Sequence, residues 1–347
     1  MPFVQPPKTV MQVVLSLRVG GLERVVLDLI QSASEEFRFI VCCLEEPGVW
    51  ADEAPRVVAL DKRPGVDGRL FWKVARLART EKIDVIHTHN SAAHLYGAIG
   101  GKLAGVKVLH TEHGKNLGEE ARAFRLNRWA GRFTDLTVAV SEKIGREARD
   151  YEGVPAERLT LVANGVCVDR FTSPRRAAGR RIGTVGRLAR EKNCPLLLRA
   201  VSAIPNAELV LVGDGPLRGE LEREADARVQ FLGQRADIAE LLAGFDVFTL
   251  SSSTEGMSIA LLEAMAAACP IVVTAVGGNT ELIQHEVTGL VVPPDDAAAL
   301  RAAIERLLAD RVLANRLGAA AREVARQRYS VTAMTRRYEE MWRWLAV

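Results

Sequence analysis

The sequence has few cysteines and no long apolar segment. No run approaches the roughly 20 apolar residues that a membrane-spanning helix needs, and the amino terminus does not combine a basic region with a long apolar core as a signal peptide does. The five cysteines are odd in number and match no zinc or disulfide framework. Such thiols are typical of buried residues in a reducing compartment. We therefore expect a cytoplasmic protein, and leave open a contact with the cytoplasmic face of a membrane.

Several common nucleotide-binding and catalytic motifs are absent as well. The dinucleotide motif GxGxxG is missing, which argues against a hydride-transfer enzyme, and there is neither a GxxxxGK[ST] phosphate loop nor a GxSxG nucleophile elbow. No Asp-x-Asp pair is present to hold a divalent metal on a nucleotide. The sequence therefore favours a metal-independent mechanism without a bound cofactor. The formal net charge of +3 is too small to indicate a nucleic acid partner.

The patterns that are present indicate an α/β protein of two domains. A length of 347 residues is more typical of two domains than of one, and short β-branched apolar runs alternate with helical patterns, as in parallel sheets with crossover helices. The first series has predicted strands at 10–17, 38–44, 56–60, 83–87, 106–110, 135–140 and 158–162, with helices at 22–31, 69–81, 91–104, 120–132 and 141–150.

The second series follows a linker candidate at 173–180. Its predicted strands are at 181–186, 207–212, 228–232, 246–250, 270–273 and 288–292, its helices are at 193–203, 216–224, 235–243, 257–267 and 296–309, and a helical pattern runs from 311 to the end. We expect two Rossmann-like domains that face each other across a cleft between the carboxyl ends of their sheets, where open α/β sheets bind ligands.

The stretch 255–268, EGMSIALLEAMAAA, carries two carboxylates around a predicted helix start. We expect a loop that ends in Glu255-Gly256 and a helix that begins at about Ser258. The first N–H groups of such a helix have no intrahelical partner and favour a phosphate or another anion. Glu263 lies roughly one and a half turns below that end, where a carboxylate suits hydroxyl groups.

Two basic residues follow the first strand of the second domain. Arg187 and Lys192 lie in TVGRLAREKN, on a loop that leads into a helix. A fork of guanidinium donors and an ammonium group at this spacing suit a diphosphate. The alternative interpretation is a solvated basic loop.

The first domain offers a glycine pair and three histidines. Gly20 and Gly21 follow the first strand and open a helix, either because a phosphate or sugar approaches the backbone or because the turn is tight. His87, His89 and His113 fall at the ends of two predicted strands, and no HExxH or equivalent supports a metal. We interpret His87 and His89 as hydrogen-bonding residues at the mouth of the cleft, and His113 as the better candidate for substrate contact.

Residues 122–133, RAFRLNRWAGRF, form a predicted amphipathic helix. Arginines group beside an apolar face that comprises Leu126, Trp129, Ala130 and Phe133. Such a helix either lies on an anionic membrane surface or packs on its own sheet with its arginines in water.

Together these features resemble glycosyltransferase family 4, whose members are retaining enzymes with the GT-B fold. The resemblance covers nearly the whole chain and depends on the order of individually weak motifs: GGLERVVLDLI, TEHG, AVSE, VANGV, TVGRLAREKN, LVGDGP, FLGQRADI, the Glu255–Glu263 stretch, AVGGNTELI and GLVVPPDD. Their wording and order are most similar to sugar transferases of bacterial exopolysaccharide and cell-surface glycan clusters. The resemblance implies an acceptor-binding domain at 1–172, a nucleotide-sugar-binding domain at 173–328 and a C-terminal helix at 329–347 that crosses back to the first domain.

The family's residue roles transfer by position. Arg187 and Lys192 correspond to the pair that holds the nucleotide diphosphate, and His113 to the histidine near the donor sugar. Glu255 matches the acid that contacts the donor sugar, and Glu263 the acid that binds the ribose. The resemblance also implies donor-binding roles for Gly20, Gly21, Gly186, Gly233, Gln234, Arg235, Gly256, Met257 and Ser258. Met257-Ser258 replaces a Phe-Gly pair that many members have.

The implied activity is transfer of a hexose from a UDP- or GDP-linked donor to a hydroxyl of a glycan or lipid-linked acceptor in cell-surface polysaccharide synthesis. Two other classes remain open. A GT-B sugar-nucleotide epimerase or phosphorylase would share the phosphate site and need no second acceptor. A non-catalytic nucleotide-sugar binding protein would bind the donor without turnover.

Overall fold

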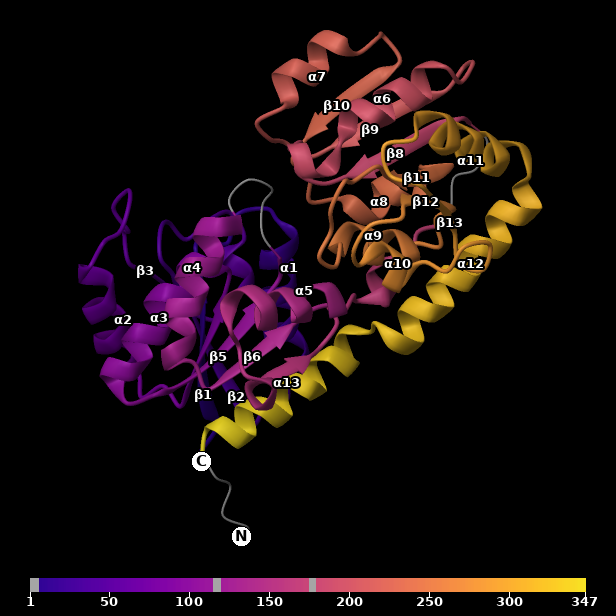
Figure 1. The fold of residues 1–347 in the computed structure, drawn as a ribbon. Coiled ribbons are helices and arrows are strands. Elements are labelled where there is room, and N and C mark those ends of the chain that lie inside the picture. The colour runs from indigo at the N-terminus through magenta and orange to yellow at the C-terminus, as the bar shows by residue number, and fades with distance from the viewer. Residues whose placement is uncertain (1–5, 115–119, 175–178) are drawn as a thin grey trace. The chain divides into compact units, whose positions relative to one another are not determined.

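The structure is a computed structural model that describes residues 6–114, 120–174 and 179–347. The chain divides into two compact units (Figure 1): unit 1 comprises Met1–Gly165 and Val331–Val347, and unit 2 comprises Val166–Ser330. The sequence-based boundaries, 172/173 and 328/329, differ from this division by a few residues. The linker candidate at 173–180 falls partly outside the described residues, because 175–178 are not described.

Unit 1 contains a seven-stranded parallel sheet in the order β3-β2-β1-β4-β5-β6-β7. The strands are β1 (Lys8–Val14), β2 (Phe37–Cys43), β3 (Val57–Ala59), β4 (Val85–His89), β5 (Lys107–Glu112), β6 (Leu136–Ala139) and β7 (Leu159–Leu161). The helices are α1 (Gly21–Ser32), α2 (Arg69–Thr80), α3 (Ser91–Ala104), α4 (Glu120–Ala130), α5 (Glu142–Glu147) with a π-helical turn at Ala148–Glu152, and α13 (Val331–Leu345).

Unit 2 repeats this plan with a six-stranded parallel sheet in the order β10-β9-β8-β11-β12-β13. The strands are β8 (Arg181–Val185), β9 (Glu208–Val212), β10 (Val229–Gly233), β11 (Val247–Leu250), β12 (Ile271–Thr274) and β13 (Leu290–Val292). The helices are α6 (Cys194–Ser202), α7 (Arg218–Glu224), α8 (Ile238–Ala243), α9 (Ile259–Ala266), α10 (Asn279–Leu282), α11 (Ala297–Ala309) and α12 (Arg311–Arg328).

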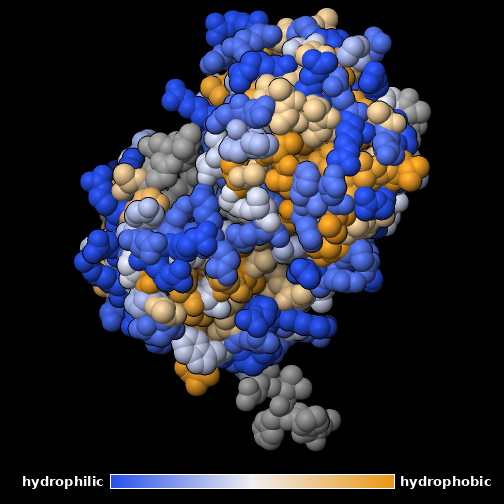
Figure 2. Space-filling model, turned by 45° about the vertical axis from the view of Figure 1, so that its right-hand side comes forward, coloured by the Kyte–Doolittle hydropathy of each residue, from blue (hydrophilic) through white to orange (hydrophobic). Residues whose placement is uncertain are grey.

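The central strands are buried on both faces because helices cover both sides of each sheet. All residues of β11 and β12 are buried, and so is every residue of β1 after Lys8. In unit 1 α1 packs against α13, and α3 packs against both α2 and α4; in unit 2 α11 packs against α6 and α12. Hydrophilic residues predominate on the face drawn in Figure 2, where hydrophobic residues gather mainly in one area of unit 2.

The C-terminal helix α13 belongs to unit 1, as the sequence resemblance implies. Its Trp342 is fully buried and meets Phe37 and Phe39 of β2 edge-on, with ring centroids 5.4 and 5.3 Å apart. The hydroxyl of Tyr338, also on α13, lies 3.1 Å from Thr111 Oγ1 on β5. These contacts make α13 part of the core of unit 1.

The predicted α/β class is confirmed, and each predicted strand and helix has a counterpart within a few residues of its expected ends. The four-residue helix α10 was not predicted, and the helical pattern after 311 is broken at Tyr329 and Ser330 into α12 and α13. Several helix starts are capped by side chains, including Asn90 before α3 and Ser258 before α9. None of the described helices is both long and apolar enough to cross a membrane.

Candidate active site

The candidate phosphate-binding residues of unit 2 lie at the topological switch point of its sheet. Strands β8 and β11 are neighbours, and the connections from them run to opposite sides, towards β9 and towards β12. Arg187 and Lys192 follow β8, and Glu255 follows β11. Open α/β sheets bind ligands at the carboxyl ends of strands at such a point. The structure therefore brings together three residues that are up to 68 positions apart in sequence.

Lys192 and Glu255 form an ion pair at this point. The Lys192 ammonium lies 2.5 Å from Glu255 Oε1, and the Ser252 hydroxyl donates to the same oxygen at 2.7 Å. The side chain of Glu255 is 7% exposed and that of Lys192 21% exposed. Ser252 was not predicted as a site residue. The position of a serine three residues before an acid, at the end of a buried strand, is the only sequence signal for it.

The backbone around this pair is held by the two strand ends. The Ser251 hydroxyl donates to the carbonyl oxygens of Lys192 and Asn193, each at 3.0 Å, and the Ser253 amide donates to Glu191 O at 2.9 Å. A Cβ on Gly277 would lie 2.0 Å from Glu255 O, so only a glycine lets the loop after β12 pack against this segment. The loops that carry Lys192 and Glu255 are thus joined by one main-chain hydrogen bond and by the hydroxyl of Ser251.

Arg187 differs from Lys192 because its side chain has no hydrogen-bond or ion-pair partner among the described residues. It is exposed and makes no side-chain hydrogen bond or ion pair with the residues that the structure describes. A charged guanidinium fork of this kind is available to a diphosphate. The sequence-based alternative, a solvated basic loop, describes Arg187 in this structure but not Lys192.

The helix start after Glu255 has the predicted form. Ser258 is the N-cap of α9, and its hydroxyl accepts from Leu261 N at 3.4 Å. Met257 is 7% exposed and packs inside, whereas Gly256 is half-buried. Glu263 is the fifth residue of α9 and is half-buried. The capped helix leaves its first N–H groups to an anion above them.

The remaining predicted donor residues of unit 2 lie on neighbouring strand ends. Gly213 takes a positive φ of +132°, and a Cβ on it would lie 2.0 Å from Gly186 O, so the loops after β8 and β9 touch through backbone alone. Gly213 N also donates to Gly233 O at 2.7 Å. Gln234 and Arg235 are exposed, and Arg235 pairs with Asp237 at 2.6 Å. This places Gly186 and Gly233 on one connected backbone edge.

In unit 1 the glycine pair begins α1 at the end of β1. Gly20 is the N-cap and Gly21 the first helical residue, and a Cβ on Gly20 would lie 2.2 Å from the Glu23 carboxylate. Burial raises the pKa of Glu23. Because the end of the flexible Glu23 side chain can move, this contact alone does not require glycine at position 20.

His89 and His113 meet at the switch point of the unit 1 sheet, between β1 and β4. His89 Nδ1 lies 3.1 Å from His113 Nε2, and His89 Nε2 lies 2.8 Å from the side-chain oxygen of Gln12 on β1. Burial lowers the pKa of His113 to about 4 and holds that of His89 well below its usual range, so both rings are neutral at pH 7. Gln12 was missed, although a single glutamine within the apolar run VMQVV is an informative anomaly.

The expectation that His87 and His89 lie at the mouth of a cleft is wrong, because both are fully buried within the sheet and its covering helices. The His87 ring packs beside Tyr338 and Trp342 of α13. Its Nε2 lies 2.8 Å from Thr111 Oγ1. Their interpretation as hydrogen-bonding residues fits these contacts. Within the described part of the chain, no group of three or more His, Cys, Asp or Glu side chains is arranged to hold a metal ion.

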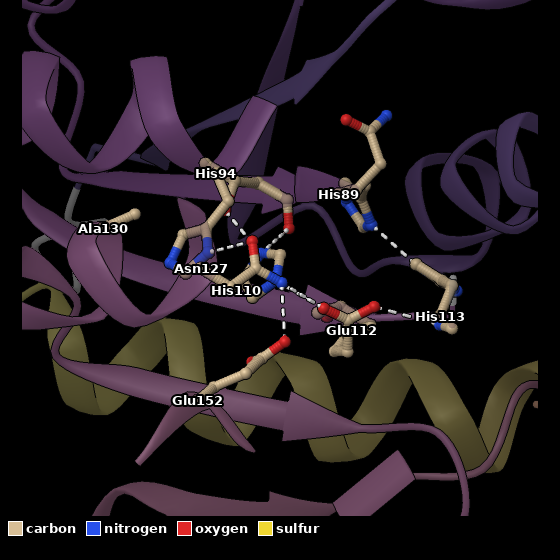
Figure 3. Close-up of polar contacts among 12 residues, drawn as sticks. His89, His94, His110, Glu112, His113, Asn127, Ala130 and Glu152 are labelled. Carbon is tan, nitrogen blue, oxygen red and sulfur yellow. Dashed lines mark hydrogen bonds and ion pairs between the residues drawn. The ribbon is translucent and has the colours of Figure 1, made fainter. Parts of the chain in front are cut away.

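A buried polar cluster, not predicted from sequence, lies next to His113 (Figure 3). The Asn127 amide on α4 donates to Glu112 Oε2 and to Glu152 Oε1, and its oxygen lies 3.1 Å from His94 Nδ1. His94 stacks on His110 with centroids 3.6 Å apart and planes 3° from parallel. We call these five residues the Asn127 cluster; Glu112 in turn accepts from Gly114 N at 3.0 Å. The cluster thereby holds the backbone that follows His113.

Helix α4 packs one face inward and exposes its arginines. Leu126, Ala130 and Phe133 contact the core of unit 1, as the second interpretation of 122–133 expects, whereas Trp129 is 44% exposed. The arginines at 122, 125, 128 and 132 are exposed and form no ion pair with described residues. This surface is basic and carries one exposed indole.

Comparisons with known proteins agree with this architecture. Two family models match, "Glycosyltransferase Family 4" over residues 19–170 and "Glycosyl transferases group 1" over residues 179–310. UDP-Gal:alpha-D-GlcNAc-diphosphoundecaprenol alpha-1,3-galactosyltransferase of Escherichia coli is 29% identical over 71% of this chain and 72% of its own. N-acetyl-alpha-D-glucosaminyl L-malate synthase of Bacillus anthracis is 28% identical over 80% of this chain and 79% of its own.

Among solved structures, Anabaena HepE in complex with UDP and glucose superposes with a TM-score of 0.85 and 25% identity, and covers 96% of this chain and 98% of its own. WaaG, a glycosyltransferase involved in lipopolysaccharide biosynthesis, has a TM-score of 0.74 at 17% identity and covers 96% of this chain and 99% of its own. The chain belongs to glycosyltransferase family 4 and has the GT-B fold.

Proposed function

We propose that this protein transfers a hexose from a UDP-linked donor to a hydroxyl of a glycan or lipid-linked acceptor, with retention of anomeric configuration and without a metal ion. The observation that carries the proposal is the group of Arg187, Lys192 and Glu255 at the switch point of unit 2. Two cations suit a diphosphate, and a nearly buried carboxylate suits sugar hydroxyls.

The relatives support a UDP-sugar donor more than a GDP-sugar donor. HepE has been solved with UDP and glucose and with UDP-glucose, and the name of the E. coli relative specifies UDP-Gal. The acceptors in the relatives' names differ, since one is a diphosphoundecaprenol-linked sugar and another is L-malate. We therefore base the glycan or lipid-linked acceptor on the resemblance to cell-surface glycan transferases.

The reaction must stabilise negative charge on the departing diphosphate. Arg187, Lys192 and the first N–H groups of α9 are preorganised for that charge, an effect that can lower a barrier by several kcal/mol. Glu255 accepts hydrogen bonds from hydroxyl groups of the donor sugar, and Glu263 accepts them from hydroxyl groups of the ribose. In the proposed front-face reaction the bond from C1 to the phosphate oxygen breaks and the bond from C1 to the acceptor oxygen forms on the same face. The acceptor proton moves to the departing phosphate oxygen.

The test has a binding step and a product step. A thermal-shift panel of UDP, GDP and their hexose conjugates identifies the base, since a ligand at about 100 times its dissociation constant stabilises by roughly 2.7 kcal/mol. NMR of the product then gives its anomeric configuration. An inverted product would refute retention, and turnover of the donor without an acceptor would favour the epimerase or phosphorylase.

We also propose that the basic surface of α4 contacts the cytoplasmic face of an anionic membrane. Each arginine near such a surface contributes about 1 kcal/mol, and an exposed indole such as Trp129 suits the interface. Replacement of the arginines at 122, 125, 128 and 132 by glutamine should abolish co-sedimentation with phosphatidylglycerol vesicles. Equal binding of both forms, or equal binding to phosphatidylcholine vesicles, would count against this contact.

A further inference from the structure

We propose that Glu255 takes the place of a phosphate group as the partner of Lys192 while no ligand is bound, so that a nucleoside diphosphate without a sugar is a weak ligand. In this arrangement Lys192 is released to the diphosphate only when an intact donor supplies sugar hydroxyls to Glu255. The inference rests on the proposed function, and it makes the pair a determinant of specificity between the donor and its spent nucleotide.

The geometry of the pair supports such an exchange. Lys192 and Ser252 both contact Oε1 of Glu255, at 2.5 and 2.7 Å, whereas Oε2 makes no hydrogen bond with any described residue. The carboxylate therefore occupies one of the three N–H donors of the Lys192 ammonium and neutralises its charge. A carboxylate and a phosphate offer the same kind of anionic oxygen to a lysine.

Only the side chains are free to exchange partners. The Ser251 hydroxyl and the Ser253 amide both donate to carbonyl oxygens of the loop that carries Lys192, and the turn at Gly277 packs against the backbone of Glu255. Lys192 has a flexible four-carbon stem, so its ammonium can move towards a phosphate while its backbone stays in place. The exchange thus needs rotamer changes rather than a loop rearrangement.

The cost of the exchange depends on the ligand. Glu255 is nearly buried, so loss of Lys192 leaves a poorly hydrated carboxylate with Ser252 as its remaining described partner. The hydroxyls of a donor sugar replace the lost donor. A free diphosphate replaces nothing and brings further negative charge close to Glu255. Arg187 pairs with no carboxylate of the described residues, so its guanidinium is available to phosphate in either case.

One consequence concerns product release. After transfer the site holds a nucleoside diphosphate without its sugar, and the Lys192–Glu255 pair can form again. Re-formation of the pair favours departure of the spent nucleotide over retention in a dead-end complex.

Calorimetric titration with UDP and with GDP tests the inference on the full-length protein. Glu255→Gln keeps the shape of the side chain but removes its charge, and we expect it to bind the diphosphate 5- to 10-fold more tightly while its transfer activity falls. Glu255→Ala should also bind more tightly, which keeps the test valid if one variant folds poorly by its melting curve. A double variant that adds Lys192→Met should lose the gain.

The matched control is Glu191→Gln, which removes an equal charge one residue from Lys192. The Glu191 side chain makes no hydrogen bond or ion pair with described residues, so its loss should leave the affinity within twofold of wild type. Equal tightening in both variants, or no tightening in the Glu255 variants, would overturn the inference and leave the proposed function intact. Failure of wild type and all variants to bind either nucleotide would overturn both.

Discussion

The two units differ in the exposure of the polar residues near their strand ends. In unit 2 Lys192 and Glu255 form a partly exposed pair whose partners a ligand can replace. In unit 1 the Asn127 cluster is almost completely buried, with Glu112 and Asn127 each 1% exposed and Glu152 3% exposed. A buried network whose bonds are internal rigidifies a fold, whereas an accessible pair is available for chemistry. The difference separates residues that bind the substrate from residues that hold the backbone after His113.

Replacement of Lys192 by alanine should have the largest effect on activity and a smaller effect on stability. Loss of one preorganised donor to the departing diphosphate lowers turnover by about 10²- to 10³-fold, or roughly 2.7–4 kcal/mol. Its removal leaves the nearly buried Glu255 without an ammonium partner, so we expect the free energy of unfolding to fall by about 1–3 kcal/mol, with a lower melting temperature. Initial rates with the donor found in the nucleotide panel, together with a melting curve, measure both quantities.

Arg190→Ala is the control for this prediction. Arg190 lies in the same 3₁₀ turn, is exposed, and makes no side-chain contact with described residues that would tie it to the site. Its variant should keep activity within about twofold. Full activity of Lys192→Ala would show that the phosphate site has been assigned to the wrong loop.

Replacement of Asn127 by leucine should reverse this pattern. Glu112, Glu152 and His94 each lose one hydrogen bond in a buried environment. A buried polar group that loses its partner costs about 1–3 kcal/mol, so we expect the free energy of unfolding to fall by about 2–4 kcal/mol. Urea unfolding followed by circular dichroism measures this change.

Arg128→Leu is its control, since Arg128 is the next residue on α4 but is exposed. Its effect should stay within about 0.5 kcal/mol. If Asn127→Leu were as stable as this control, the cluster would not hold unit 1 together and the contrast between the units would fail.

Much of the fold could be predicted from sequence, and so could the candidate site residues of unit 2. Apolar runs such as VFTL and IVVT are typical of strands buried on both faces, and both are strands here. The sequence also placed Lys192 on a loop after the first strand of the second domain and Glu255 at the end of a loop before a helix, whereas the adjacency of the two strand ends came from the structure. Helix α10 was missed because a four-residue helix has no periodicity to detect.

The Asn127 cluster could not be predicted, because its bonds join residues that are 15 and 25 positions apart and lie on different elements. A pattern shows that a polar residue is present but not which partner it meets. The same limit explains the error for His87 and His89. Alternation placed them on one face of a strand, but α13, which covers that face, comes from the far end of the chain.

Mild acid should destabilise unit 1 before unit 2. Burial lowers the pKa of His113 to about 4 and holds those of His87 and His89 well below the usual value of about 6.5. The unfolded chain therefore binds more protons than the folded one below pH 6.5, and stability falls as the pH drops from about 6.5 towards 4. For His113 alone the loss between pH 7.5 and 5.0 is about 2 kcal/mol.

Hydrogen exchange at the two pH values, corrected for the intrinsic rates, assigns this loss to a unit. Five of the six histidines lie in unit 1, so its strands should lose protection first. His113→Gln should be less sensitive to acid than wild type by about 2 kcal/mol. Equal loss of protection in both units would show that the histidines do not set the acid limit.

The smallest effects come from removal of a single hydroxyl group in each unit, which makes them the sharpest test of the comparison. Ser252→Ala removes the hydroxyl that donates to Glu255, and Thr88→Val removes the one that contacts His110 Nδ1 at 2.9 Å. Both residues are buried. Ser252→Ala removes one hydrogen bond, worth about 1 kcal/mol, whereas Thr88→Val also removes a second, longer one to Leu109 O at 3.3 Å. We expect Ser252→Ala to lower kcat/KM about fivefold and the free energy of unfolding by about 1 kcal/mol. Thr88→Val should lower the free energy of unfolding by about 1 kcal/mol and leave kcat/KM within twofold. The opposite pattern would mean that the accessible pair is structural and that the buried cluster acts in catalysis.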